Sequence, residues 1–204
     1  MSEKALKGVV ALLMAAMVWL SGCSGIQMRQ SNLVYEAKNK ISEGDLRTSI
    51  PILNKALALD PNDLEANVAM AEVQYRLGNF HDALRYAKKA HLVRPRDFRA
   101  LGILGLIDLE EGAYERGMNR VYEAVKIYEG IEEVGGNLPV EPEIIIKEMR
   151  SELKQNGKVS HEKVNALADA FWAKVDWYEF DEEYRKWHFR SFYDVRPDGG
   201  APIP

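Results

Sequence analysis

The feature that most constrains the fold of this chain is a spacing of 34 residues that recurs along its first two thirds. Glycines, alanines and prolines repeat at this spacing: Gly44, Gly78 and Gly112; Ala56, Ala90 and Ala124; Pro61 and Pro95. A fixed period of this length indicates an array of similar units, each of which buries its apolar face against the next. The chain is therefore predicted to be a stack of short repeats.

Each repeated position has a structural reason within a pair of helices. Glycine ends the first helix, because it adopts the left-handed conformation at little cost. Asp45 and Asn79 follow two of these glycines and are expected to cap the second helix of their units. The recurring alanines let the helices approach closely, and proline ends each pair. The sequence therefore predicts an all-α fold built from helix pairs.

The third unit departs from the pattern. It has Glu129 where proline would fall, and Gly117 in place of a small alanine. Its second helix is therefore expected to continue, over residues 115–128. In the first unit, Pro51 lies near the start of the second helix and is expected to delay that start by a few residues.

These residues resemble the tetratricopeptide repeat, a helix pair with a turn glycine, small residues in the second helix and a closing proline. The resemblance implies a solenoid over residues 32–131, with repeats at about 30–63, 64–97 and 98–131. It also implies that the first helices line a groove that binds an extended peptide or a helix of another protein. By this resemblance the residues expected to face the groove and bind the partner are Lys38, Ile41, Glu72, Tyr75, Arg76, Arg99, Leu106 and Glu110.

The N-terminus has the pattern of an export signal. Lys4 and Lys7 precede an uncharged stretch, residues 8–20, that is too short to span a bilayer. The end of this stretch, Leu-Ser-Gly-Cys at residues 20–23, resembles the lipobox of bacterial lipoproteins. That resemblance implies removal of residues 1–22, lipidation of Cys23, the only cysteine, and a tether over residues 23–31. The alternative is an uncleaved anchor in which the cysteine is incidental. The same resemblance to lipoproteins implies that Ser24, in place of the aspartate of an inner-membrane retention signal, favours the outer membrane over the inner, with the protein facing the periplasm.

Residues 132–193 follow no 34-residue register. A helix is expected from Pro142 to Asn156 and another from about Ser160, either as a degenerate repeat or as a cap on the solenoid. Aromatic residues crowd the end of this region, where residues 181–183 are expected to begin a short last helix. Trp177, Tyr184 and Trp187 either pack against the solenoid or form an exposed interface. The tail, residues 194–204, is expected to be disordered.

Several classes of function have no support in the sequence. The four histidines stand in no metal-ligand spacing, no nucleotide-binding or nucleophile motif occurs, and the lone cysteine is committed to the lipobox. We therefore expect no enzyme activity, cofactor or metal. A net charge of −4 argues against nucleic acid.

Two hypotheses remain. The first is an interaction scaffold or assembly factor for an envelope complex, such as pilus or secretion, outer-membrane assembly or cell-wall machinery. The alternative is a structural subunit that self-associates through its aromatic C-terminal region.

Overall fold

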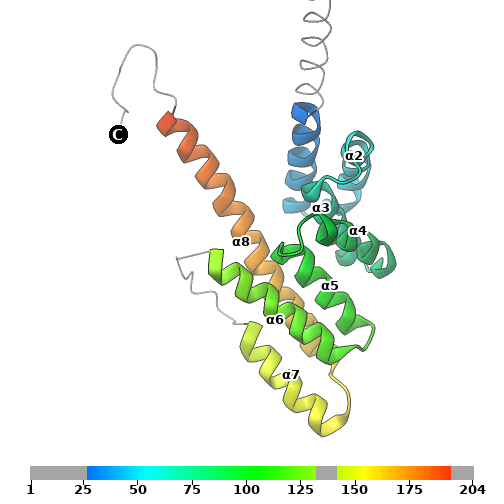
Figure 1. Cartoon of the computed structure of the whole chain (residues 1–204). Helices are drawn as coiled ribbons and strands as arrows, with labels where there is room; N and C mark the ends of the chain where they lie inside the picture. Colours follow the sequence, from blue (N-terminus) through cyan, green and yellow to red (C-terminus); the bar gives the residue numbers. More distant parts are fainter. Residues whose placement is uncertain (1–26, 132–141, 194–204) are drawn as a thin grey trace, which may run out of the picture. The chain divides into compact units, whose positions relative to one another are not determined.

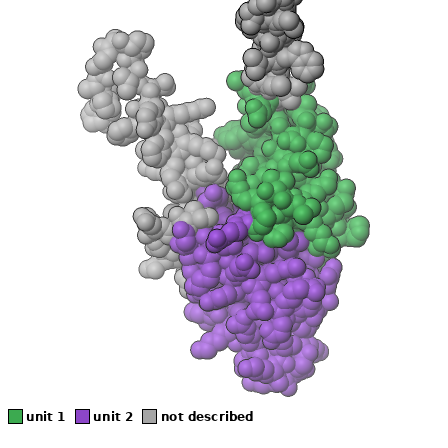
Figure 2. All heavy atoms as spheres, in the orientation of Figure 1, with its two compact units in different colours: residues 1–95 green, residues 96–204 purple. Residues whose placement is uncertain are grey.

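The computed structural model describes residues 27–131 and 142–193, and in the last helix it describes side chains through Asp176 and that of Tyr178 (Figure 1). The predicted signal peptide, residues 23–26 of the predicted tether and the predicted tail fall outside these residues, whereas residues 27–31 of that tether form the start of the first helix. The chain divides into two compact units, residues 1–95 and 96–204 (Figure 2). Each unit is described below by itself.

Every element in the described part of the chain is a helix, which confirms the predicted all-α class. Unit 1 has a first helix over residues 27–42, followed by α2 (Leu46–Leu59), α3 (Leu64–Arg76) and α4 (Phe80–Val93). Unit 2 has α5 (Phe98–Glu110), α6 (Tyr114–Ile131), α7 (Pro142–Asn156) and α8 (His161–Tyr193). The starts of α2, α4 and α6, and those of α3 and α5, are each 34 residues apart, so the helices follow the period of the sequence.

The three turn glycines have the predicted left-handed conformation, with φ of +80°, +77° and +78° at Gly44, Gly78 and Gly112. Each turn repeats one pair of backbone hydrogen bonds. At the second turn, the Gly78 N–H donates to the Tyr75 carbonyl at 2.8 Å, and the Asn79 N–H donates to that of Gln74 at 2.8 Å. A side chain at these φ values would be strained, which explains why glycine recurs there.

The helix caps follow the prediction only in part. The carboxylate of Asp45 accepts a hydrogen bond from the Thr48 N–H at 3.3 Å, as expected. Asn79 makes no such bond, so its predicted capping role is wrong. Its amide nitrogen instead donates to the side-chain oxygen of Gln74 at 2.9 Å. The amide side chain therefore joins two helices rather than closing one.

The prediction for Pro51 is also wrong, because α2 begins at Leu46 and contains the proline. Because proline has no N–H, one backbone hydrogen bond is lost, the one to the carbonyl four residues earlier. That carbonyl lies in the first turn of the helix. Pro51 is exposed, so water can satisfy that carbonyl. The extension of α6 agrees with the prediction, since this helix runs to Ile131.

Small residues bring the helices of each pair together. The alanines of the repeat, at positions 56, 90 and 124, are fully buried. In unit 2, Gly105 of α5 faces Gly117 of α6. A Cβ atom on Gly117 would lie 2.7 Å from the Gly105 carbonyl oxygen and 2.6 Å from Cγ of Leu109. The substitution of glycine for alanine in the third unit therefore allows a closer approach of the two backbones.

The C-terminal region contains two helices rather than three. The bounds of α7 agree with the prediction, but α8 continues for 33 residues, so the separate short last helix is wrong. No glycine or proline interrupts residues 161–193, and the acidic residues 181–183 alone do not break a helix. The α7 helix packs against α6, and α8 packs along α5.

Candidate functional site

In each unit the candidate site is the face of its first helices, which are residues 27–42 and α3 in unit 1 and α5 in unit 2. In unit 1, Lys38 lies on the helix of residues 27–42 and is half-buried. Its Nζ is 2.7 Å from Oε2 of Glu65 on α3, so an ion pair joins the two first helices across this face. Ile41 is 7% exposed and belongs to the core of the unit. Of these two predicted groove residues, only Lys38 reaches the surface.

The other predicted residues of unit 1 lie at the end of α3. Glu72 is buried and forms an ion pair with Arg76 at 2.9 Å. Tyr75 is 8% exposed, and its ring is tilted on that of Phe80 with centroids 5.4 Å apart. A buried carboxylate needs such a partner, so Arg76 stabilises the fold as well as reaching solvent. The structure thus brings Glu72, Tyr75 and Arg76 together, with Arg76 the most accessible of them.

In unit 2 the predicted residues lie on α5 and are largely covered. Leu106 is fully buried. Arg99 is 2% exposed and donates to Oδ2 of Asp97 at 2.9 Å. The carboxylate of Glu110 lies 3.9 Å from Nδ1 of His161, the first residue of α8. The α5 face is therefore less open than the resemblance implied.

The helix that covers this face is α8 of the same chain. A Cβ atom on Gly102 would lie 2.0 Å from Cζ of Phe171, so the phenyl ring rests directly on the α5 backbone. Further along, the rings of Tyr178 and Phe98 meet edge to face with centroids 5.0 Å apart. From the start of α8 to Tyr178, the contacted residues of α5 go from Glu110 back to Phe98, so the two helices are antiparallel. The α8 helix therefore covers the face that the third repeat would offer a partner.

The aromatic residues of the C-terminal region divide into two groups. Phe171 and Trp172 are buried, and Tyr178 also packs 6.5 Å from Tyr128 between ring centroids. These residues form part of the unit 2 core. The side chains of Trp177, Tyr184 and Trp187 lie outside those that the structure describes, so the interface predicted for them stays a prediction.

Within residues 27–131 and 142–193 no three His, Cys, Asp or Glu side chains are grouped so that they could bind a metal ion. In the same ranges no helix is both long and apolar enough to cross a membrane. Cys23 lies outside the described residues. Its lipidation stays a prediction from the sequence.

One surface was missed by the sequence analysis. On α7, Lys147, Arg150 and Lys154 follow one another at helical spacing on the wall of a cavity. The signal was present in the sequence, since these three positions share one face of any helix over residues 142–156. The periodicity analysis considered only the apolar face of that helix.

Comparison with known proteins agrees with this architecture. Residues 40–107 match the family described as tetratricopeptide repeat. The Sgt2 TPR domain from Aspergillus fumigatus is similar in structure, with a TM-score of 0.53 and 18% identity over 64% of this chain and 85% of that one. MamA from Desulfovibrio magneticus RS-1 gives a TM-score of 0.48 at 18% identity over 72% and 74%. No curated protein matches the sequence. The chain therefore contains helix-hairpin repeats of the tetratricopeptide type, a fold that points to protein–protein interaction.

Proposed function

We propose that this chain is a lipid-anchored scaffold that binds other proteins at the periplasmic face of the outer membrane and helps an envelope complex to assemble. The observation that supports the scaffold role is the repeat architecture, in which helix pairs of the tetratricopeptide type follow one another along the chain. The anchor and the location rest on the sequence around Cys23 and Ser24.

The face most available to a partner is that of unit 1. It carries the Lys38–Glu65 ion pair and the guanidinium of Arg76. Both signs of charge on this face suit a peptide or helix that has polar groups of its own. The α5 face of unit 2 takes α8 instead. We assign to α8 the role of a cap that closes the array.

The anchor predicts a simple change in partitioning. We expect wild-type protein expressed in a diderm bacterium to enter the detergent phase in Triton X-114 separation, because two or more acyl chains hold it stably in lipid. The Cys23→Ala variant should move to the aqueous phase or persist as a larger, unprocessed precursor. A Ser24→Ala variant, which retains the thiol, serves as the control. Detergent-phase recovery of Cys23→Ala at its mature size would contradict the lipid anchor.

The scaffold role is tested by affinity capture from the solubilised envelope, followed by quantitative mass spectrometry. A charge swap, Lys38→Glu with Glu65→Lys, keeps the ion pair but reverses the charges presented on the unit 1 face. We expect it to reduce recovery of true partners about tenfold, because misplaced charges at an interface oppose binding and about 1.4 kcal/mol corresponds to a tenfold change in affinity.

The matched control is the swap Lys40→Glu with Glu43→Lys. That ion pair, 2.6 Å long, lies on an exposed part of the same segment. Recovery should stay unchanged in the control. An identical set of captured proteins from wild type and both swaps would remove the unit 1 face as the binding site. The alternative, a self-associating subunit, predicts that the captured protein is another copy of this chain.

A further inference from the structure

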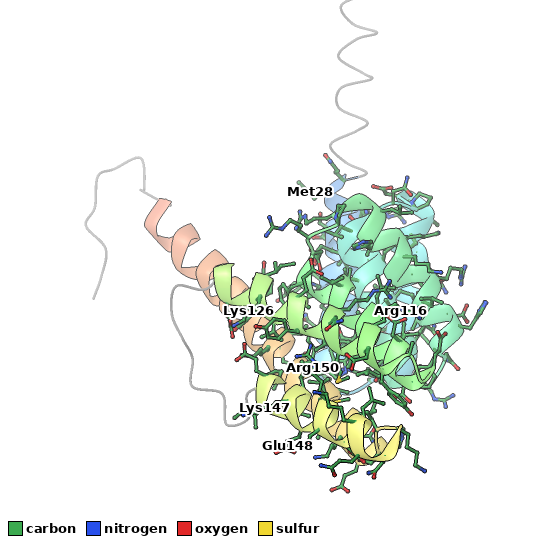
Figure 3. The ribbon with its side chains drawn as sticks, turned by 60° about the horizontal axis from the view of Figure 1, so that its bottom comes forward. Met28, Arg116, Lys126, Lys147, Glu148 and Arg150 are labelled. Carbon is green, nitrogen blue, oxygen red and sulfur yellow. The ribbon has the colours of Figure 1, made fainter. Side chains whose placement is uncertain are left out.

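A cleft between α6 and α7 in unit 2 has a composition that its surroundings do not explain. The cavity has a volume of about 310 Å³. Tyr122 of α6 forms one wall, and residues of α7 form the other: Ile146, Lys147, Arg150, Ser151 and Lys154. Figure 3 labels the side chains of Lys147 and Arg150 on α7 and that of Lys126 on α6. This cleft is separate from the face of the first helices.

The positive charge in the cleft is not compensated. Lys147, Arg150 and Lys154 are spaced i, i+3 and i+7 on one helical face, where like charges repel one another. Within the described part of the chain no ion pair with a carboxylate is recorded for any of the three. Arg150 donates to the neutral Asn119 amide oxygen at 2.8 Å. The arrangement therefore lacks a negative partner among these residues.

The one acidic side chain in the cleft is already paired. Glu143 lies 2.6 Å from Nζ of Lys126, which also binds Glu129 at 2.8 Å. The hydrogen bonds to Glu129 and then Glu143 raise the pKa of Lys126, so this lysine stays charged. Glu143 is thereby engaged by a residue outside the three cations, and Lys126 shares its single charge between two carboxylates. In a chain with a net charge of −4, a local excess of positive charge on one face favours an anionic ligand.

The shape of the cleft limits what that ligand is. A volume near the lower limit of small-molecule sites leaves room for one or two side chains rather than a whole cofactor. The cations lie along a concave surface, which a flat bilayer cannot follow. Tyr122, which lines the same cavity, is 40% exposed, so apolar contact is also available. An acidic peptide segment with an interspersed apolar residue fits all three features.

We propose that the α6–α7 cleft binds an acidic segment of a partner protein, with its carboxylates at Lys147, Arg150 and Lys154 and an apolar side chain against Tyr122. This inference rests on the scaffold function proposed above and names the chemistry of one of its partners. The contact is electrostatic and solvent-accessible, so its affinity falls as salt rises.

The test is fluorescence anisotropy with the full-length protein in detergent. The probe is a fluorescein-labelled ten-residue peptide of alternating Glu and Leu, and a peptide with Gln for Glu is its control. We expect binding of the Glu peptide only, weakened roughly fivefold in the double variant Lys147→Gln/Lys154→Gln, since each exposed charge contributes modestly. The matched variant Lys55→Gln/Lys88→Gln changes two exposed lysines of unit 1 and the same net charge, and it should bind like the wild type.

Several results would overturn the inference. Equal binding of the Gln peptide removes the role of carboxylates, and equal weakening in both double variants indicates net charge alone. Absence of peptide binding also overturns it, as does sedimentation with phosphatidylglycerol vesicles that depends on Lys147 and Lys154 while no peptide binds. Such failures leave envelope capture by the unit 1 face untouched. Conversely, peptide binding without any captured protein would contradict the scaffold function and not the cleft.

Discussion

Replacing Asp97 with alanine is expected to lower the free energy of unfolding of unit 2 by about 4 kcal/mol, because it breaks a buried ion pair and removes a helix cap. The Asp97 carboxylate accepts from the backbone N–H groups of Arg99 and Ala100 at 3.1 and 3.2 Å. It also accepts from the Arg99 guanidinium at 2.9 Å, and both side chains are at most 4% exposed. Denaturant unfolding followed by tryptophan fluorescence measures the change, since Trp172 lies in this unit.

The repeat supplies a matched control one period earlier. Asp63 caps α3 in the same way, accepting from the Ala66 N–H at 2.6 Å, but Glu65 stands where Arg99 would be. Asp63→Ala should therefore remove only the helix cap and lower the free energy of unfolding of unit 1 by about 1 kcal/mol. Denaturant unfolding followed by circular dichroism measures this change. Asp97→Asn retains a good cap but removes the negative charge from the Asp97–Arg99 pair, and should fall nearer to the alanine variant. Equal losses at positions 63 and 97 would show that the buried ion pair adds nothing.

The second large effect is expected at Gly102. A methyl group there would overlap the Phe171 ring, with the nearest ring carbons at 2.0 and 2.3 Å, and that ring is 1% exposed. Gly102→Ala should lower the free energy of unfolding of unit 2 by about 2 kcal/mol, because overpacking outweighs the gain of about 1 kcal/mol in helix propensity. The same fluorescence-detected denaturation measures it.

Two further variants make this result specific to the contact between α5 and α8. Gly130→Ala, in α6, meets no atom within 4 Å and should be neutral or slightly stabilising. Phe171→Leu replaces the phenyl ring with a smaller side chain and so makes room for a methyl group at position 102. The double variant with Gly102→Ala should therefore lose about 1 kcal/mol less free energy of unfolding than the sum of the two single losses. Additive losses would mean that the ring does not rest on Gly102 in solution.

The parts of the fold that the sequence predicted correctly depend on local interactions. A left-handed turn glycine, a buried alanine and a closing proline each act within a few residues, and they recur at one spacing. Gly44, Gly78 and Gly112 could therefore be assigned from the chain alone. At Pro51 the local rule allowed the helix to start before or after the proline, and exposure to solvent allows the earlier start. At Asn79 the side chain could cap α4 or bind elsewhere, and the neighbouring Gln74 side chain takes its hydrogen bond.

Long-range packing could not be predicted in this way. The spacing of Val164, Leu167 and Phe171 predicts which face of α8 is buried, but not that this face packs along α5. The groove positions on α5 came from the resemblance, which assumes an open face. Gly102 was the available signal, since a glycine in the middle of an apolar helix suggests close approach of another group. The role of the groove residues in binding stays a prediction.

The placement of α8 on α5 also sets the terms on which another molecule could compete for that face. A helix held in the same chain acts at an effective concentration in the millimolar range, whatever the amount of protein present. If α8 itself has an intrinsic Kd of about 1 μM for the bare α5 face, an outside helix would then appear roughly a thousandfold weaker than its own intrinsic Kd. Ordinary cellular concentrations of a rival cannot displace it at that ratio. The α5 face is therefore occupied by the chain's own helix at any protein concentration. The concentration of a partner affects binding only at the surfaces that α8 does not cover.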